Sequence, residues 1–333
     1  MSLETRATRR RALATFALAV LLVIGVALLV GKAAGYEEVL DALRAADPRW
    51  LPACLAGEIV SYCGYVVGFR AVAEAERGPT LGLRLSTEIV FLSLGATRLL
   101  AVGGAGGLAL DYWALHRTGM SRHAAFLRVL ALNTLLYGVF GLAAWSAALV
   151  LLVRDDAPIA LVAPWLFVVP ACVAAGIWVS GPGRAARLAR RDGGRARALF
   201  ADAVGGVVLV RGLLFDPPGR LGALGAAAYW GGDMFCLWAA LQAFRVETTV
   251  AAVVLAYATG YAATLVPLPT GGVGSVEAAM TFALVAVGVG LSPALLGVVT
   301  YRLFSYWLPT IPALLVLPRL PAISTELEAF AKR

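Results

Sequence analysis

Apolar residues of this chain gather in long runs that are separated by short polar stretches. The runs cover residues 12–31, 51–67, 85–102, 124–153, 158–180, 221–244, 249–268, 275–289 and 293–317. A helix needs about 20 such residues to cross roughly 30 Å of hydrocarbon. The runs lack the strict alternation of apolar and polar residues that marks barrel strands. The pattern therefore predicts an all-α polytopic membrane protein.

The first run and the polar stretch after it predict a helix followed by a short interfacial helix. The basic sequence RATRRR precedes residues 12–31, as in a signal peptide, but the apolar core is too long and no convincing cleavage site follows. We therefore expect an uncleaved first helix. In the next stretch, YEEVLDALRAADPRW, Val39, Leu40 and Leu43 fall on one helical face, which is typical of a helix lying at the membrane surface.

Composition agrees with a membrane protein. Hydrophobic residues make up 60% of the 333 positions, charged residues make up 14%, and the mean hydropathy is +0.82. These values exclude a soluble domain with a charged surface.

The longest polar interruption is the arginine-rich link RAARLARRDGGRARALF, which carries six arginines against a single acid, Asp192. The positive-inside rule predicts that this link, residues 184–202, is cytoplasmic together with the basic N-terminus. If every run before the link crossed the membrane, the link would lie outside. One segment before it must therefore turn back.

The segment at 85–117 is the best candidate for a re-entrant hairpin that enters from the cytoplasm. Its centre, VGGAGG, contains Gly103, Gly104 and Gly106, and glycine reaches backbone angles that other residues avoid. Non-helical backbone survives at membrane depth only when it is buried in protein or lines a wet cavity. The hairpin therefore predicts an interior site.

A second broken segment, LVPLPTGGVGSVEA, lies within residues 249–289 and predicts a second hairpin. Its turn residues are Pro267, Pro269, Gly271, Gly272 and Gly274, and the following arm should begin near Ser275. Both glycine turns are followed by a short apolar arm and then by glycine, an apolar residue and serine. We interpret the two segments as a weak internal repeat.

The predicted topology makes this repeat inverted, because the second hairpin would enter from outside, as in many alternating-access transporters. Full spanning by both of its arms would leave the C-terminus on the same side, so charge does not decide between these alternatives. The expected organisation is a first membrane half (1–183), the cytoplasmic link (184–202), a second membrane half (203–320) and a cytoplasmic tail (321–333). We expect the plasma membrane as the location.

Charged residues inside the apolar runs are the candidate transport residues. An ionised side chain near the bilayer centre costs about 3 kcal/mol on insertion scales, so each should have a partner or water. Glu277 lies in the first turn after the second glycine motif, where the helix dipole favours a carboxylate, and Arg302 is its expected partner. Two interpretations stay open: a structural pair, or a functional one in which Arg302 binds a lipid phosphate or the pair opens during transport.

The first half offers Arg98 and Asp111, which flank the first glycine turn, and Glu88 on the entering arm. We favour a structural ion pair between Arg98 and Asp111 across the hairpin. Glu58, Asn133 and Asp233 also lie in apolar runs, so they should face the bundle interior or a cavity.

Signatures of catalysis, cofactors, metals and nucleic-acid binding are poor. TGGVGS lacks the lysine of a phosphate-binding loop, and Ser275 does not fit a nucleophile elbow. The four cysteines lie in apolar runs without paired spacing, so we expect small core residues and neither a disulfide nor a metal site. An acid pair of Glu277 with Asp233 in a transferase has no support in their spacing. The formal net charge of +8 is explained by orientation and by anionic inner-leaflet lipids at the arginine link, so we expect no nucleic acid.

The sequences LVPLPTGGVGSVEAAM and GVGLSPALLGVVTYRLFSYWLP resemble the C-terminal signature of the flippase-like membrane domain associated with lysylphosphatidylglycerol synthases. The resemblance covers nearly the whole chain, including the GMS that follows the first glycine turn. The positions that it carries over are Pro269, Gly271, Gly272, Gly274, Glu277, Arg302, Tyr306 and Trp307. On spacing alone, the two aromatic residues are more typical of packing or of interface anchors.

The resemblance implies movement of a lipid between leaflets, in the best-known members an aminoacylated phosphatidylglycerol. The printed sequence ends at Arg333, shortly after its last apolar run, so we expect no synthase activity and no other enzyme activity. The first glycine turn also lacks the proline of the second, so the site of the first half follows less directly from the family.

The leading hypothesis is a lipid translocase for a phospholipid or polyprenyl-type lipid. In it, Arg98 and Arg302 attract an anionic head group, and Glu277, Glu88 or Asp111 responds to protons or to a cationic head group. The alternatives are a non-transporting accessory protein that presents lipids to a cell-envelope enzyme, and a proton-coupled carrier of small solutes.

Overall fold

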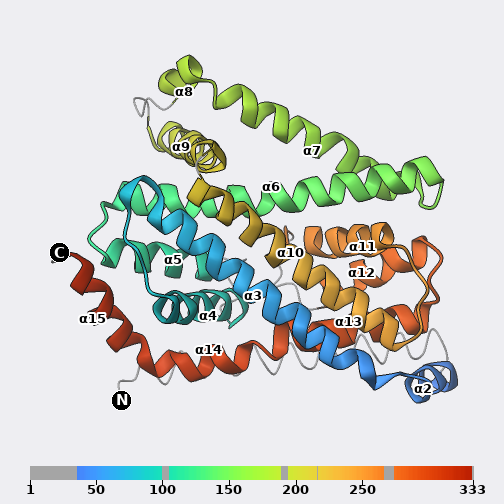
Figure 1. Cartoon of the computed structure of the whole chain (residues 1–333). Helices are drawn as coiled ribbons and strands as arrows, with labels where there is room; N and C mark the ends of the chain where they lie inside the picture. The colour runs from blue at the N-terminus through green and yellow to red at the C-terminus, as the bar shows by residue number, and fades with distance from the viewer. Residues whose placement is uncertain (1–35, 100–104, 189–193, 216, 266–273, 332–333) are drawn as a thin grey trace.

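The computed structural model describes residues 36–99, 105–188, 194–215, 217–265 and 274–331 (Figure 1). These residues are almost entirely helical, and no strand occurs among them. The all-α membrane fold expected from the apolar runs is confirmed. The expected first helix and most residues of the two glycine turns lie outside the described residues: Gly103, Gly104, Pro267, Pro269, Gly271 and Gly272.

The α-helices are connected by short turns. In chain order they are α2 (Tyr36–Arg44), α3 (Leu51–Glu74), α4 (Leu83–Leu99), α5 (Ala105–Arg117), α6 (Arg122–Arg154), α7 (Ile159–Val179), α8 (Pro182–Leu188), α9 (Arg195–Phe215), α10 (Pro217–Ala243), α11 (Val250–Ala262), α12 (Ser275–Ala286), α13 (Leu291–Arg302), α14 (Thr310–Val316) and α15 (Leu320–Ala331). A π-helical turn, Leu303–Trp307, joins α13 to α14.

Several helical stretches are long and apolar enough to cross a membrane. Among the described residues there are five: Pro48–Arg77, Arg122–Arg154, Ile159–Val179, Ala196–Phe215 and Leu291–Ala331. The protein is therefore a multi-pass membrane protein.

Helix α7 lies at the outside of the bundle (Figure 1). It exposes Phe167 (75%) and Ile177 (68%), which a bilayer would cover. Two of the four cysteines, Cys172 on α7 and Cys63 on α3, are also exposed, so the expectation of four core cysteines is wrong for these two. An apolar run does not tell a core face from a lipid face, because both are apolar.

Helices α3 and α10 run side by side in opposite directions through the middle of the molecule (Figure 1). Glycines allow their backbones to touch: a Cβ on Gly57 would lie 2.7 Å from the carbonyl oxygen of Gly232, and one on Gly64 would lie 2.5 Å from that of Gly225. Small residues at such crossings are the usual means of close helix packing in membranes. The contact fixes which side chains of α3 and α10 meet.

Helices α4 and α5 pack against each other, as do α11 and α12. The first pair has 17 and 13 residues and the second has 13 and 12. At about 1.5 Å per residue, three of these four helices are shorter than 20 Å, well below a bilayer's hydrocarbon thickness. Both segments that were expected to be hairpins are therefore pairs of short helices.

Each helix pair has an open end, where its first helix begins and its second helix ends. The open ends of the two pairs lie near opposite ends of α6. Near the N-terminal end of α6, the guanidinium of Arg128 donates to the carbonyl of Ala75 just after α3 (2.6 Å), and Arg70 of α3 donates to the carbonyl of Leu81 just before α4 (3.0 Å). Near the C-terminal end of α6, Leu151 lies in one apolar cluster with Leu255 of α11, against which Val287 packs just after α12.

Sequence analysis missed one helix. It treated residues 184–202 as a polar link, but α9 begins at Arg195 and continues to Phe215. Arg211 interrupts the apolar pattern there, and its Nη1 donates to the carbonyl of Ser180 (2.8 Å). In Figure 1, α9 is seen nearly end-on while α6 runs across the view, so the two helices cross steeply.

The expected tail at 321–333 is also largely helical. In α15, Ile323 and Leu327 are fully buried, and Glu328 forms an ion pair with Arg117 at the end of α5. The apolar face of α15 escaped detection because it is too short to register as a span.

Candidate functional site

A cavity of about 770 Å³ lies in the centre of the bundle and is lined by residues from both halves of the chain. Its lining includes Arg98 of α4, Asp233 of α10 and Arg302 of α13, together with eight tyrosines. The cavity thus combines charged side chains with aromatic rings that each carry one polar hydroxyl.

Glu277 and Arg302 form a buried ion pair next to this cavity. Their side chains are 3% and 12% exposed, and the Nε of Arg302 donates to Oε1 of Glu277 (2.7 Å). The other carboxylate oxygen, Oε2, accepts from the backbone N–H of Gly274 (2.6 Å), which precedes α12 with a φ of +91°. The expected pair and the expected start of α12 at Ser275 are both confirmed, and each oxygen of Glu277 has a partner within the protein.

The expected pair of Arg98 with Asp111 is wrong. Arg98 donates from Nη1 to the hydroxyl of Tyr62 (2.5 Å) and from Nη2 to the carbonyl of Ser305 (2.6 Å). Within the part of the chain that the structure describes, no carboxylate lies within ion-pair distance of Arg98. The partners of its guanidinium are therefore neutral.

The carbonyl of Ser305 is free to accept because of Pro309. In a continuous α-helix this carbonyl would bond to the N–H four residues later, and proline has none. The π turn adds to the distortion, since Leu308 N–H bonds to Leu303 O at 2.9 Å.

Asp111 is fully buried at α5 and accepts from the hydroxyl of Tyr65 (3.2 Å), while its Oδ1 has no hydrogen-bond partner. Adjacency across the glycine turn suggested a pair with Arg98. The long side chain of Arg98 extends toward the π turn instead, a direction that sequence spacing does not encode.

Asp233 lines the cavity, and its Oδ2 accepts from the hydroxyl of Tyr257 (2.5 Å). Its Oδ1 is buried without a hydrogen-bond partner. The expectation that Asp233 faces an interior cavity is confirmed. Glu58, on α3, is 4% exposed and also buried as expected.

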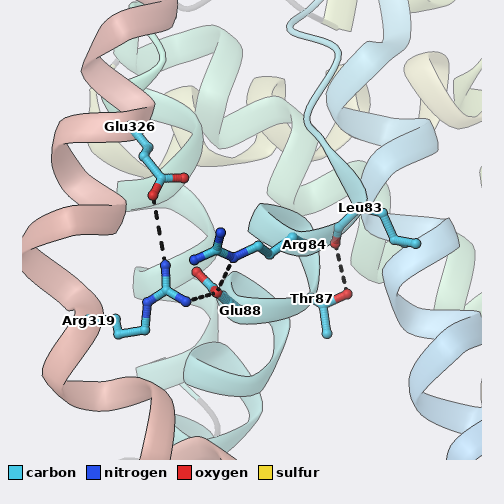
Figure 2. Close-up of polar contacts among 6 residues, drawn as sticks. All are labelled: Leu83, Arg84, Thr87, Glu88, Arg319 and Glu326. Atoms are coloured by element: carbon cyan, nitrogen blue, oxygen red, sulfur yellow. Dashed lines mark hydrogen bonds and ion pairs between the residues drawn. The ribbon is translucent and has the colours of Figure 1, made fainter.

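Glu88 does not line the cavity. Figure 2 shows its carboxylate between two arginines: Oε1 accepts from Arg84 Nε (3.2 Å) and from Arg319 Nη1 (2.6 Å). Arg319 also approaches Glu326 of α15 (3.8 Å). Glu88 therefore ties α4 to the C-terminal helices rather than contributing to the cavity.

Tyr306 connects the two cavity arginines. Its hydroxyl donates to the carbonyl of Arg98 (3.1 Å), and the guanidinium of Arg302 lies 4.4 Å from its ring centroid. Trp307 packs edge-on against Tyr306 (5.2 Å between centroids) and does not line the cavity. Of the two signature aromatics, Tyr306 is thus the one at the site.

Sequence reasoning missed Tyr62, Tyr257 and Ser305 as polar contacts of the charged cavity residues. For Ser305 a signal was present, because Pro309 lies four residues downstream in an otherwise helical run. The two tyrosines carry no such signal, since tyrosine is common in membrane helices for packing alone.

Comparison with known protein families identifies the family of this chain. The family model described as the lysylphosphatidylglycerol synthase TM region matches residues 16–313. A comparison with curated proteins gives no significant match. Because the family model covers most of the chain, including both short-helix pairs and the cavity, the chain belongs to the lysylphosphatidylglycerol synthase TM region family.

Proposed function

We propose that this protein is a membrane lipid translocase that moves a phospholipid or a related polyprenyl-type lipid between leaflets. Its family and its spanning helices make it a lipid-related membrane protein. The observation that carries the finer proposal is the central cavity with Arg98, whose partners are neutral. In this proposal no covalent bond of the lipid is made or broken.

The chemistry of the cavity suits a phosphate-bearing head group. A guanidinium offers five donors in a planar fork that matches phosphate oxygens. Arg98 uses its donors on a hydroxyl and a carbonyl, so its positive charge is available to an anion. The volume of about 770 Å³ falls within the usual range for small-molecule sites, about 300–1,000 Å³.

The arrangement of the short-helix pairs supports alternating access. The pair α4–α5 opens at one end of α6, and the pair α11–α12 opens at the other. We infer that they are re-entrant hairpins of an inverted repeat that enter from opposite faces and meet at the cavity.

Charge supports an orientation for this arrangement. Arg70, Arg117 and Arg319 lie at the end where the first pair opens, and the positive-inside rule assigns that end to the cytoplasm. We propose that the N-terminus, the arginine-rich link and the C-terminus are cytoplasmic in a plasma-membrane protein. The arginines of the link would meet anionic lipids of the inner leaflet there.

The test is lipid scrambling in proteoliposomes that carry labelled phosphatidylglycerol, aminoacylated phosphatidylglycerol, phosphatidylethanolamine or a polyprenyl phosphate. Wild type is compared with Arg98→Gln and with Arg211→Gln, a matched substitution of an arginine on α9 that does not line the cavity and donates to a backbone carbonyl. Movement of at least one lipid by wild type and by Arg211→Gln, with loss in Arg98→Gln, is the expected result.

Two other results would replace the proposal. Saturable lipid binding with no movement of any of the four lipids, by a folded protein, would favour the accessory protein that presents lipids to a cell-envelope enzyme. Uptake of a water-soluble anion without lipid movement would favour the small-solute carrier.

A further inference from the structure

One of the close contacts between α3 and α10 brings two acidic side chains together. A Cβ on Gly232 would lie 2.5 Å from the carbonyl oxygen of Gly57, and the next residue on each helix is acidic: Glu58 on α3 and Asp233 on α10. Because the two helices run in opposite directions (Figure 1), the residue that follows each glycine lies on the same side of the contact. The glycine contact thus places two acids against each other at the wall of the cavity.

Both acids have an unsatisfied oxygen. Oε1 of Glu58 and Oδ1 of Asp233 are buried and have no hydrogen-bond partner. An ionised carboxylate only accepts hydrogen bonds, so neither can satisfy the other while both are charged. Two adjacent buried carboxylates also repel each other, and one bound proton removes the repulsion and supplies the missing donor.

We propose that Glu58 and Asp233 share one proton and form a proton-binding site in the wall of the central cavity. The structure offers fewer ligands than a metal ion would need, since hard cations take six or more oxygens. No group of three or more histidine, cysteine or acidic side chains that could hold a metal occurs among the described residues.

The number of protons on the pair affects Arg98 electrostatically, because one of the residues around the pair also contacts Arg98. Tyr62 lies one helical turn after Glu58 on α3 and accepts from Arg98 (2.5 Å). Tyr257 of α11 donates to Asp233 (2.5 Å). The titratable and charged groups around the pair are Tyr62, Tyr229, Cys236, Tyr257, Tyr261, Tyr301 and Arg98.

A charge balance then couples the proton to an anion. With one shared proton the pair carries one negative charge, which forms no ion pair with Arg98 but weakens its attraction for an anion. Uptake of a second proton leaves Arg98 uncompensated and strengthens its attraction for an anionic head group. By linkage, a bound anion strengthens proton binding by the same factor. This coupling rests on the proposed lipid translocation, whereas the proton site itself does not.

Infrared difference spectra of the purified full chain in nanodiscs, recorded as the pH is stepped, test the proton site directly. The wild type should show the carbonyl band of a protonated carboxyl group that disappears as the pH rises. Glu58→Gln and Asp233→Asn should each remove this band, because the proton belongs to the pair. Asp111→Asn reports on another buried acid that has an unpaired oxygen, and Glu247→Gln, at an exposed acid, is the matched control; both should keep the band of the pair.

The outcomes separate the proton site from the proposed function. The proton site is overturned if the band survives in both single variants, if only Asp111→Asn removes it, or if sodium at constant pH replaces it. Scrambling under an imposed pH gradient is measured in parallel. A band that depends on both acids in a protein that moves no lipid would leave the proton site standing and remove the translocase. Lipid movement that ignores pH, with no protonated carboxyl, would do the reverse.

Discussion

The two arginines of the central cavity are chemically identical but have different partners. Arg302 lies against the carboxylate of Glu277 (2.7 Å), and that carboxylate also caps α12. Arg98 binds a hydroxyl and a backbone carbonyl. The first arginine is neutralised by a partner built into the fold, and the second keeps its charge for the cavity. The comparison assigns Arg302 mainly to architecture and Arg98 to ligand attraction.

The largest effect is expected from breaking the neutralised arginine's pair. Glu277→Ala leaves Arg302 buried without its counter-charge and removes the cap of α12, so we expect a loss of about 3–5 kcal/mol of stability. Thermal unfolding in detergent measures it. Restoration of part of the loss in the double variant Glu277→Gln/Arg302→Met would confirm that the uncompensated charge is the cause. Equal midpoints for Glu277→Ala and wild type would contradict it.

Arg98→Gln should destabilise the protein less than Glu277→Ala does, but it should cause a large loss of ligand binding. Its removal leaves a hydroxyl and a carbonyl unpaired, which costs about 1–3 kcal/mol. Binding of anionic lipid, measured by native mass spectrometry, should weaken at least tenfold. Arg98→Lys should recover part of the binding, because the charge returns without the fork of donors. If the variant Arg302→Gln weakened binding as much as Arg98→Gln does, the division between the two arginines would be wrong.

Pro309→Ala tests how the neutral partner of Arg98 arises. The new N–H can bond to Ser305 O in a regular helix and would compete with the guanidinium for that carbonyl. We expect weaker anion binding, by severalfold, with stability changed by about 1 kcal/mol or less. Pro170→Ala, which removes an exposed proline from the interior of α7, is the matched control and should leave binding unchanged.

Some of this contrast could be predicted from sequence. The apolar runs predicted the helices, and the capping position of Glu277 predicted both the start of α12 and a nearby cation, because a buried acid needs a partner. The partners of Arg98 could not be predicted in the same way, because a long flexible side chain at a helix end reaches several elements. The pairing of Glu58 with Asp233 depends on the register of α3 against α10, which is set by contacts of Gly57 with Gly232 and of Gly64 with Gly225, pairs that are 175 and 161 residues apart in the chain.

At α9 the sequence-based prediction failed in a different way, because it missed a helix. The predicted apolar runs did not include residues 203–215, where Arg211 interrupts the apolar pattern and its guanidinium bonds to the carbonyl of Ser180. One charged residue with a local partner is compatible with an apolar helix, but the partner is visible only in three dimensions.

The smallest effect is expected at Glu88 and Arg319, an ion pair of similar length (2.6 Å) whose arginine side chain is 37% exposed and whose buried glutamate keeps Arg84 as a second partner when Arg319 is replaced. Water screens such a pair, so Arg319→Gln should cost only a few tenths of a kcal/mol, and added salt should reduce the cost further. A double-variant cycle with Glu88→Gln, measured by thermal unfolding at low and high salt, isolates the pair. A coupling as large and as insensitive to salt as that of Glu277 with Arg302 would show that burial is not what separates the two pairs. The distinction between the cavity arginines would then have to rest on geometry alone.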